Sequence, residues 1–209
     1  MAETRGLVIA APASGSGKTF VTLALLRALR SAGIRVASAK VGPDYIDPRF
    51  HEAATGRPCP NLDPWAMSPP QLRGLAMQAS DRDLLVIEGV MGLFDGAEAG
   101  GGSTADLAAL FGLPVILVVD ARRQAQSVAA LVSGFAGFRA DCRIAGVILN
   151  RVGSPRHRAI LESALAERDI PVLGALPESG DLVMPSRHLG LVQAGEHGDL
   201  EAFLDRAAR

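Results

Sequence analysis

With 209 residues, the sequence is long enough for one α/β domain with a substantial hydrophobic core. Its formal net charge of −1 gives no electrostatic case for binding nucleic acid or a membrane, and its single Trp and single Tyr disfavour a base-stacking surface. The apolar runs fall short of the ~20 residues needed to span a bilayer, and the N-terminus lacks the pattern of a secretory signal. We therefore expect a soluble, cytoplasmic protein that binds neither nucleic acid nor a membrane.

Strand-like apolar runs alternate with helical patterns along the whole chain. The predicted strands are about Gly6–Ala11, Arg35–Lys40, Leu84–Glu88, Val115–Val119, Ala145–Leu149 and Val172–Ala175. The predicted helices cover residues 18–32, 71–80, 103–111, 123–137, 155–168 and 199–208. Most strands are continuous apolar runs, as expected for strands buried on both faces of a parallel sheet. The pattern predicts a doubly wound α/β fold with a mostly parallel sheet, whose strands all end at the edge where a ligand should bind.

The first predicted strand leads into a glycine-rich loop and then directly into a helix, as in the phosphate-binding pattern G-x-x-x-x-G-K-[ST]. In such a loop, backbone N–H groups and the helix N-terminus cradle the phosphates. Lys18 would reach the outer phosphates, and the Thr19 hydroxyl would ligate Mg²⁺. Pro12 replaces the first consensus glycine and lacks an N–H, but the donors that face the phosphates lie later in the loop. An ordinary strand-to-helix turn is the alternative. The predicted nucleoside-triphosphate site comprises Ser14, Gly15, Ser16, Gly17, Lys18 and Thr19.

Polar residues stand at the ends of four predicted strands, namely Lys40, Glu88, Asp120 and Asn150. One such residue would be explained as a helix cap or a solvated loop residue, but four around a phosphate loop are more typical of a site. Glu88 occupies the usual place of a second Mg²⁺ anchor. The amide of Asn150 offers a donor and an acceptor, which suits the edge of a purine.

Residues 41–62 contain several prolines, which predict a rigid connection without helix or strand. We expect Asp44 and Asp47 to be held in this connection beside Lys40, facing the phosphate site. Asp63 precedes Pro64, and a turn or helix-capping role explains it as well as a functional one does. Asp95 lies in the glycine-rich turn after the third predicted strand, within reach of substrate or metal.

Six motifs, in order over nearly the whole chain, resemble the cobyrinic or hydrogenobyrinic acid a,c-diamide synthases. They are Ala11-Pro-Ala-Ser-Gly-Ser-Gly-Lys-Thr19, Lys40-Val-Gly-Pro-Asp-Tyr-Ile-Asp-Pro48, Asn61-Leu-Asp-Pro-Trp65, Glu88-Gly-Val-Met-Gly-Leu-Phe-Asp-Gly96, Asn150-Arg-Val152 and Arg187-His-Leu-Gly-Leu191. The resemblance implies a P-loop NTPase-like fold of the dethiobiotin synthetase type. It also implies an ATP-dependent ligase of cobalamin biosynthesis, which converts the a- and c-acetate carboxylates of a corrinoid to carboxamides through acyl phosphates.

The same resemblance implies roles for individual residues, with ATP and Mg²⁺ as cofactors. Lys40 would neutralise the attacking carboxylate and the transferring phosphoryl group, and Asp44 or Asp95 would accept a proton from ammonia. Tyr45 and Ile46 match positions that would contact the corrinoid. The implied catalytic residues are Lys18, Lys40, Asp44, Asp47, Glu88 and Asp95, the implied metal ligands are Thr19, Asp47 and Glu88, and Asn150 joins the loop in binding the nucleotide.

Full-length members of the resembled family also carry a C-terminal glutamine amidotransferase domain, which needs a reactive cysteine. Cys59 is flanked by prolines and Cys142 precedes a strand, so neither stands at the sharp turn that such a nucleophile needs. We therefore expect residues 1–209 to be the synthetase domain alone, using free ammonia or ammonia donated by a glutaminase domain outside this chain. The sequence leaves open a homodimer and the choice between cobalt-free and cobalt-containing substrate.

Two other functions stay open at this point. A dethiobiotin synthetase-like ligase would share the fold, but the motifs at 40–48 and 61–65 argue against it. An ATPase switch of the ParA/MinD type would carry a second lysine five residues before Lys18, where this chain has Ala13. No basic surface helix or amphipathic membrane tail supports the switch either.

Overall fold

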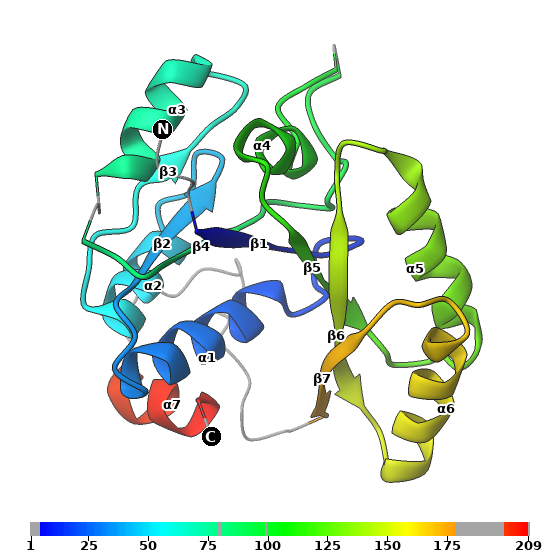
Figure 1. Ribbon diagram of the computed structural model, residues 1–209. Helices are drawn as coiled ribbons and strands as arrows, with labels where there is room; N and C mark the ends of the chain where they lie inside the picture. The colour runs from blue at the N-terminus through cyan, green and yellow to red at the C-terminus, as the bar shows by residue number, and fades with distance from the viewer. Residues whose placement is uncertain (1–4, 79–80, 99, 179–198, 209) are drawn as a thin grey trace.

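A seven-stranded sheet forms the centre of the molecule (Figure 1). The computed structural model describes residues 5–78, 81–98, 100–178 and 199–208. The strands are β1 (Gly6–Ala10), β2 (Val36–Val41), β3 (Asn61–Leu62), β4 (Leu84–Glu88), β5 (Val115–Asp120), β6 (Ile144–Val152) and β7 (Val172–Pro177). Every strand pair is parallel, and the strand order is β3-β2-β4-β1-β5-β6-β7. The predicted doubly wound α/β fold is confirmed.

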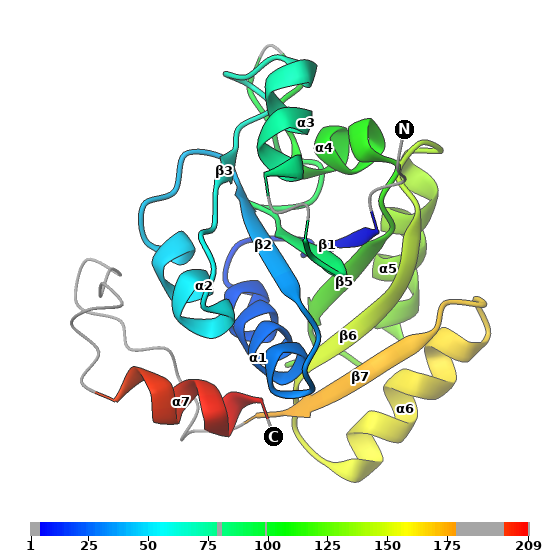
Figure 2. The same cartoon turned by 60° about the vertical axis from the view of Figure 1, so that its left-hand side comes forward.

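Helices cover both faces of this twisted sheet (Figure 2). They are α1 (Lys18–Ser31), α2 (Asp47–Thr55), α3 (Pro69–Met77), α4 (Thr104–Phe111), α5 (Ser127–Phe138), α6 (Pro155–Ala166) and α7 (Leu200–Ala207). Helices α1, α2 and α7 pack on one face, and α3, α4, α5 and α6 pack on the other. No helix of the described chain is long and apolar enough to cross a membrane.

The strands are apolar on both sides because each side contributes to a different core. In β1, Val8 and Ala10 belong to the core under α3–α6, whereas Ile9 belongs to the core under α1, α2 and α7. In β4, Ile87 and Val86 divide in the same way. Since side chains alternate across a strand, Glu88 lies on the same face as Val86, towards α1 and α2. This alternation decides which helices surround the site.

The expectation that residues 41–62 lack regular structure is wrong. This connection contains helix α2 and strand β3. Pro48 is the second residue of α2, where its missing N–H would have no intrahelical partner in any case. Asp47 is therefore fixed by the first turn of a helix, and Asp44 caps that turn, since its Oδ1 accepts from the N–H groups of Ile46 and Asp47.

Two boundaries differ from the prediction in ways that matter for the site. Strand β6 continues to Val152, which places Asn150 and Arg151 inside the strand. Helix α3 starts earlier than predicted, after a capping box in which Gln71 Oε1 accepts from the N–H of Ser68 at 2.8 Å. Residues 79–80, predicted as the end of this helix, and the motif Arg187–Leu191 lie outside the described residues.

Helix α7 lies against α1 in both cartoon views (Figures 1 and 2). Arg27 of α1 makes ion pairs of 2.7 Å with both Glu201 and Asp205 of α7. Beneath these surface pairs, Phe203 makes an edge contact with Phe20, with ring centroids 6.3 Å apart. Surface ion pairs contribute little, so burial of the apolar side of α7 is what holds it in place.

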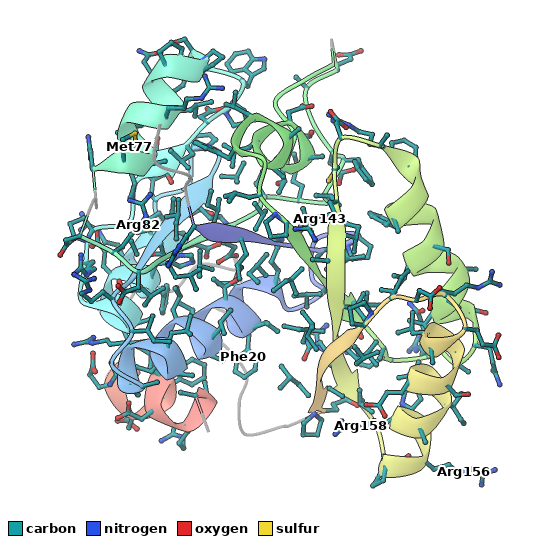
Figure 3. The ribbon with its side chains drawn as sticks, in the orientation of Figure 1. Phe20, Met77, Arg82, Arg143, Arg156 and Arg158 are labelled. Atoms are coloured by element: carbon teal, nitrogen blue, oxygen red, sulfur yellow. The ribbon has the colours of Figure 1, made fainter. Side chains whose placement is uncertain are left out.

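We predict that Leu204→Ala lowers the free energy of unfolding by about 2–5 kcal/mol, because Leu204 is fully buried between α7 and the core. Met77→Ala is the matched control, because Met77 has a similar volume but lies 60% exposed at the end of α3 (Figure 3). Its effect should stay within about 0.5 kcal/mol. Chemical denaturation of both variants measures the difference, and equal effects would mean that α7 is not part of the folding unit.

Candidate active site

The loop between β1 and α1 is held open by side chains that bind its carbonyl groups from outside. The Asn150 amide donates to the carbonyl of Ser16 at 2.9 Å, and Arg151 Nη1 donates to the carbonyl of Gly15 at 2.7 Å. Within the loop, Ser16 Oγ donates to the carbonyl of Ala13 at 2.9 Å. Carbonyls drawn outwards favour N–H groups that point inwards, which is the arrangement an anion needs.

Gly17 fixes how closely this loop approaches β6. It caps α1 in the left-handed backbone region, with φ +87°, a conformation that side chains disfavour. A Cβ atom at this position would also overlap the amide nitrogen of Asn150. Gly17 is therefore required both by the backbone turn and by the contact with β6.

A buried carboxylate, Glu88, lies beside the loop at the end of β4. Its Oε1 accepts from Thr19 Oγ1 at 2.6 Å and from Lys40 Nζ at 3.0 Å. Its Oε2 lies 2.6 Å from His51 Nε2. Burial works to raise the pKa of Glu88, but Lys40 and His51 outweigh it and bring this pKa far below its usual range. Glu88 is therefore a permanent negative charge, surrounded by donors from three elements.

Lys40 is the cation at the centre of this cluster, one strand away from Glu88 and in register with it. Its Nζ lies 2.7 Å from Asp47 Oδ2 and 4.0 Å from Asp44 Oδ2. Burial works to lower the pKa of Lys40, but Glu88 and Asp47 outweigh it and raise this pKa above its ordinary value. Burial and the charge of Glu88 raise the pKa of Asp47, against the opposing effect of Lys40. The lysine stays protonated, while Asp47 accepts a proton more readily than an exposed aspartate.

Lys18 is the second lysine of the site, and the whole sequence contains only these two. Its Nζ donates to the carbonyl of Met91 at 3.2 Å. Met91 itself has φ 48°, an unusual backbone conformation for a methionine. Burial lowers the pKa of Lys18, and Lys40 lowers it further while Glu88 raises it. The two ammonium groups are therefore close enough to influence each other.

The sequence analysis missed His51, which is fully buried in α2. Its Nδ1 lies 3.5 Å from Cys59 Sγ, opposite the Glu88 contact. Burial lowers the pKa of His51, but hydrogen bonds to Cys59 and Glu88 outweigh it and raise this pKa to about 10. Had helix α2 been predicted, the four-residue spacing from Asp47 to His51 would have placed both on one helix face.

Residues 44–46 connect this cluster to the protein surface. The Asn61 amide donates to the carbonyl of Asp44 at 2.8 Å and so ties the connection to β3. Tyr45 is 86% exposed, whereas Ile46 packs against the core under α1 and α2. The substrate contacts proposed for both residues stay predictions, and only Tyr45 stands fully at the surface.

The other predicted polar residues lie at the margins of the cluster. Asn150 uses its donor on the loop, as described above, and its Oδ1 accepts from the N–H of Arg151, so its contact with a purine stays a prediction. Asp95 is exposed and accepts from the N–H of Gly92 at 2.8 Å, beside the carbonyl of Pro12.

Asp63 and Asp120 have structural partners. Asp63 Oδ1 accepts from the N–H groups of Trp65 and Ala66, which is the turn considered from the sequence. Asp120 pairs with Arg151 Nη1 at 2.7 Å and so supports the clamp on the loop.

The oxygens of Thr19, Asp47 and Glu88 converge beside Lys18. Thr19 Oγ1 is 2.6 Å from Glu88 Oε1 and 3.3 Å from Asp47 Oδ2. Such hard oxygen donors fit Mg²⁺, which keeps several waters and takes its remaining ligands from phosphates. The described residues contain no group of three or more His, Cys, Asp or Glu that would form a complete metal site by themselves. The donor set therefore fits a cation that arrives together with a nucleotide.

We predict that Gly17→Ala abolishes nucleotide binding and lowers the free energy of unfolding by more than Gly33→Ala does. Both glycines have left-handed backbones, with φ +87° and +81°, but a Cβ at Gly33 meets nothing within 4 Å. Gly33→Ala should cost about 1 kcal/mol from the backbone alone and keep ATP binding. Calorimetric titration with ATP and denaturation of both variants measure this, and ATP binding by Gly17→Ala would contradict the proposed loop geometry.

We also predict that His51 makes stability depend on pH in the protein free of nucleotide and metal. Its folded pKa of about 10 exceeds the unfolded value of 6.5, so its contribution is complete below pH 6.5 and is lost as the pH rises towards 10. The free energy of unfolding should fall over this window in the wild type and fall much less in His51→Gln. His157→Gln serves as the control, because His157 lies outside the cluster and bonds the carbonyl of Gln124. An unchanged pH slope in His51→Gln would contradict the assignment.

Comparison with known proteins places this site in context. The family model described as the CobQ/CobB/MinD/ParA nucleotide binding domain matches residues 7–192. A protein of Brucella anthropi named hydrogenobyrinate a,c-diamide synthase is 63% identical over 206 residues, covering 98% of this chain and 47% of that protein. Proteins of the same name from Rhizobium meliloti and Rhodobacter capsulatus are 61% and 54% identical, and each match covers 48% of the relative. The chain thus spans about half the length of the curated relatives it matches.

A solved structure, that of chloroplast FtsY from Physcomitrella patens, matches with a TM-score of 0.57 and 17% identity. The match covers 100% of this chain and 67% of that one. At this identity the likeness concerns the fold alone. The match to the family model, by contrast, extends over nearly all the elements described above, including the phosphate loop and the cluster around Glu88. This chain therefore belongs to the CobQ/CobB/MinD/ParA family of nucleotide-binding domains.

Proposed function

We propose that this chain catalyses the ATP-dependent amidation of the a- and c-acetate carboxylates of hydrogenobyrinic or cobyrinic acid, in cytoplasmic cobalamin biosynthesis. The names of its relatives favour the cobalt-free acid. The proposal is supported most strongly by one structural observation, the position of Lys40. A second buried lysine, Lys40, lies beside the phosphate loop and is held by three carboxylates. A cation in this place suits a substrate that is itself a carboxylate.

The phosphate loop would hold the triphosphate of ATP. Its inward N–H groups and the N-terminus of α1 would bind the phosphate oxygens, and Lys18 would exchange the Met91 carbonyl for the outer phosphates. Thr19, Glu88 and Asp47 would hold Mg²⁺, which supplies positive charge to the β- and γ-phosphate oxygens when bound. Since Thr19 already bonds Glu88, its hydroxyl is oriented before the nucleotide arrives.

Lys40 would guide the substrate carboxylate towards the γ-phosphorus. In the proposed first step, a carboxylate oxygen bonds to that phosphorus while the bond to the β,γ-bridging oxygen breaks, which yields an acyl phosphate and ADP. The ammonium group lowers the repulsion between two anions, and its raised pKa keeps it protonated throughout. The carboxylates that hold Lys40 also fix its position, so little reorganisation accompanies the transfer.

Ammonia would then attack the acyl carbon, with loss of inorganic phosphate and of one proton. Asp44 and Asp95 are the proposed proton acceptors. Asp44 uses Oδ1 to cap α2 and directs Oδ2 towards Lys40, and Asp95 is exposed near the loop. We propose that a glutaminase unit outside this chain supplies the ammonia, because Cys59 and Cys142 are both buried and unsuited to attack glutamine.

We predict that the wild-type chain, given ATP, Mg²⁺, ammonium and hydrogenobyrinic acid, forms products in which NH₂ replaces OH once and then twice, as mass spectrometry would show. Lys40→Met should lower kcat by roughly 100-fold or more, because the cation that offsets the two anions is lost. Arg49→Met is the control, since Arg49 is exposed and pairs with Glu52 on the same helix. Parallel reactions with the cobalt-containing acid decide between the two substrates.

Two further measurements make this assay decisive. ATP titration of Lys40→Met distinguishes a loss of chemistry from a loss of fold, because the described hydrogen bonds connect Lys40 to the phosphate loop through Glu88 and not directly. Glutamine in place of ammonium should give no product with this chain alone. If neither corrinoid is converted while ATP still binds, the proposed function is wrong, and a ligase or switch of another kind takes its place.

A further inference from the structure

Three large apolar side chains stand exposed at the edge of the sheet where the strands end. Tyr45 follows β2, Trp65 follows β3 and Met91 follows β4, with exposures of 86%, 74% and 45%. These strands are neighbours in the order β3-β2-β4, so their ends span about 10 Å of the edge. We call Tyr45, Trp65 and Met91 the apolar rim. The rim includes the only Trp and the only Tyr of the sequence.

The backbones of Trp65 and Met91 are fixed by specific contacts. The N–H of Trp65 donates to Asp63 Oδ1 at 3.0 Å, and its backbone passes Gly102 so closely that a Cβ there would lie 3.0 Å from the Trp65 Cβ. Met91 is held in an unusual backbone conformation while its carbonyl accepts from Lys18. Exposed apolar side chains that are held in place by their backbones are typical of a surface that binds a ligand.

Two members of the rim, Tyr45 and Met91, adjoin the charged cluster. Lys40 belongs to the strand that precedes Tyr45, and Met91 bonds Lys18 through its carbonyl. A ligand seated on the rim would therefore have an apolar face over aromatic and thioether groups and an anionic edge near two buried ammonium groups. A flat macrocycle with carboxylates on its periphery has this combination, whereas a small aliphatic acid would leave the rim uncovered.

We infer that Trp65 and Met91, together with Tyr45, form the surface on which the flat face of the macrocyclic substrate rests, with one peripheral carboxylate directed towards Lys40. This inference rests on the proposed function and adds to it two binding residues, Trp65 and Met91. It also explains how one carboxylate is selected for reaction. The rim binds the flat face of the ring, so a carboxylate on the edge of the ring can turn towards Lys40.

The test compares the Michaelis constants of rim variants. Trp65→Ala should raise the KM for the corrinoid about tenfold and leave the KM for ATP unchanged, because an aromatic anchor contributes binding but does not touch the phosphate loop. Trp65→Phe should retain most of the affinity. Met91→Ala keeps the carbonyl that Lys18 uses, so it should raise only the KM for the corrinoid. Met77→Ala, an exposed methionine at the end of α3, should change neither constant.

The outcomes separate this inference from the proposed function. If the wild type converts the corrinoid and Trp65→Ala and Met91→Ala change its KM no more than Met77→Ala does, the rim is not the substrate surface and the proposed function stands. Equal increases in the KM for ATP would indicate general damage and would also overturn the inference. If the wild type neither converts the corrinoid nor binds it in equilibrium dialysis, both proposals fail.

Discussion

The burial of the Glu88 carboxylate is the constraint on which the site depends. A fully buried charge is tolerated only when donors surround it, and here Thr19 of α1, Lys40 of β2 and His51 of α2 supply them. Removing one partner of such a group costs about 3–5 kcal/mol, because the remaining charge stays buried. One side chain thus fixes two helices and two strands relative to each other, and the geometry of the site is part of the stability of the fold.

The order of the strands explains why this carboxylate lies where it does. Strand β4 enters the sheet between β2 and β1, although it comes later in the chain than both. Its last residue therefore falls between Lys40, at the end of β2, and the phosphate loop, at the end of β1. On the other side of β1, Asp120 and Arg151 from β5 and β6 hold the loop from outside. The charged residues of the site thus lie on the β4 side of the loop, and the residues that support the loop lie on its β5 side.

The fold and the charged core of the site could be predicted because apolar runs mark parallel strands and polar residues follow them. Lys40 and Glu88 were found in this way, from their places at strand ends. Helix α2 was missed because the prolines of the connection 41–62 indicate a break, whereas Pro48, in the first turn of the helix, favours its start. His51 was missed with it, since a single histidine in an assumed loop has no periodicity to reveal its partners. The carbonyl contacts of Asn150 and Arg151 depend on the length of β6, which sequence patterns leave uncertain by a few residues.

The scarcity of lysine has a consequence for how this protein can be handled and followed. Of the 21 Lys and Arg residues, all but Lys18 and Lys40 are arginines, so these two carry the only side-chain primary amines of the 209 residues. Of the two lysines, Lys18 has the lowered pKa, so succinimidyl dyes and other acylating probes would react there first and would compete with the nucleotide. The extent of Lys18 labelling would therefore report how fully the phosphate loop is occupied by nucleotide. An acyl phosphate that waited too long for ammonia would meet Lys18 as a nearby nucleophile, because burial lowers the pKa of Lys18, whereas the raised pKa of Lys40 keeps that amine protonated.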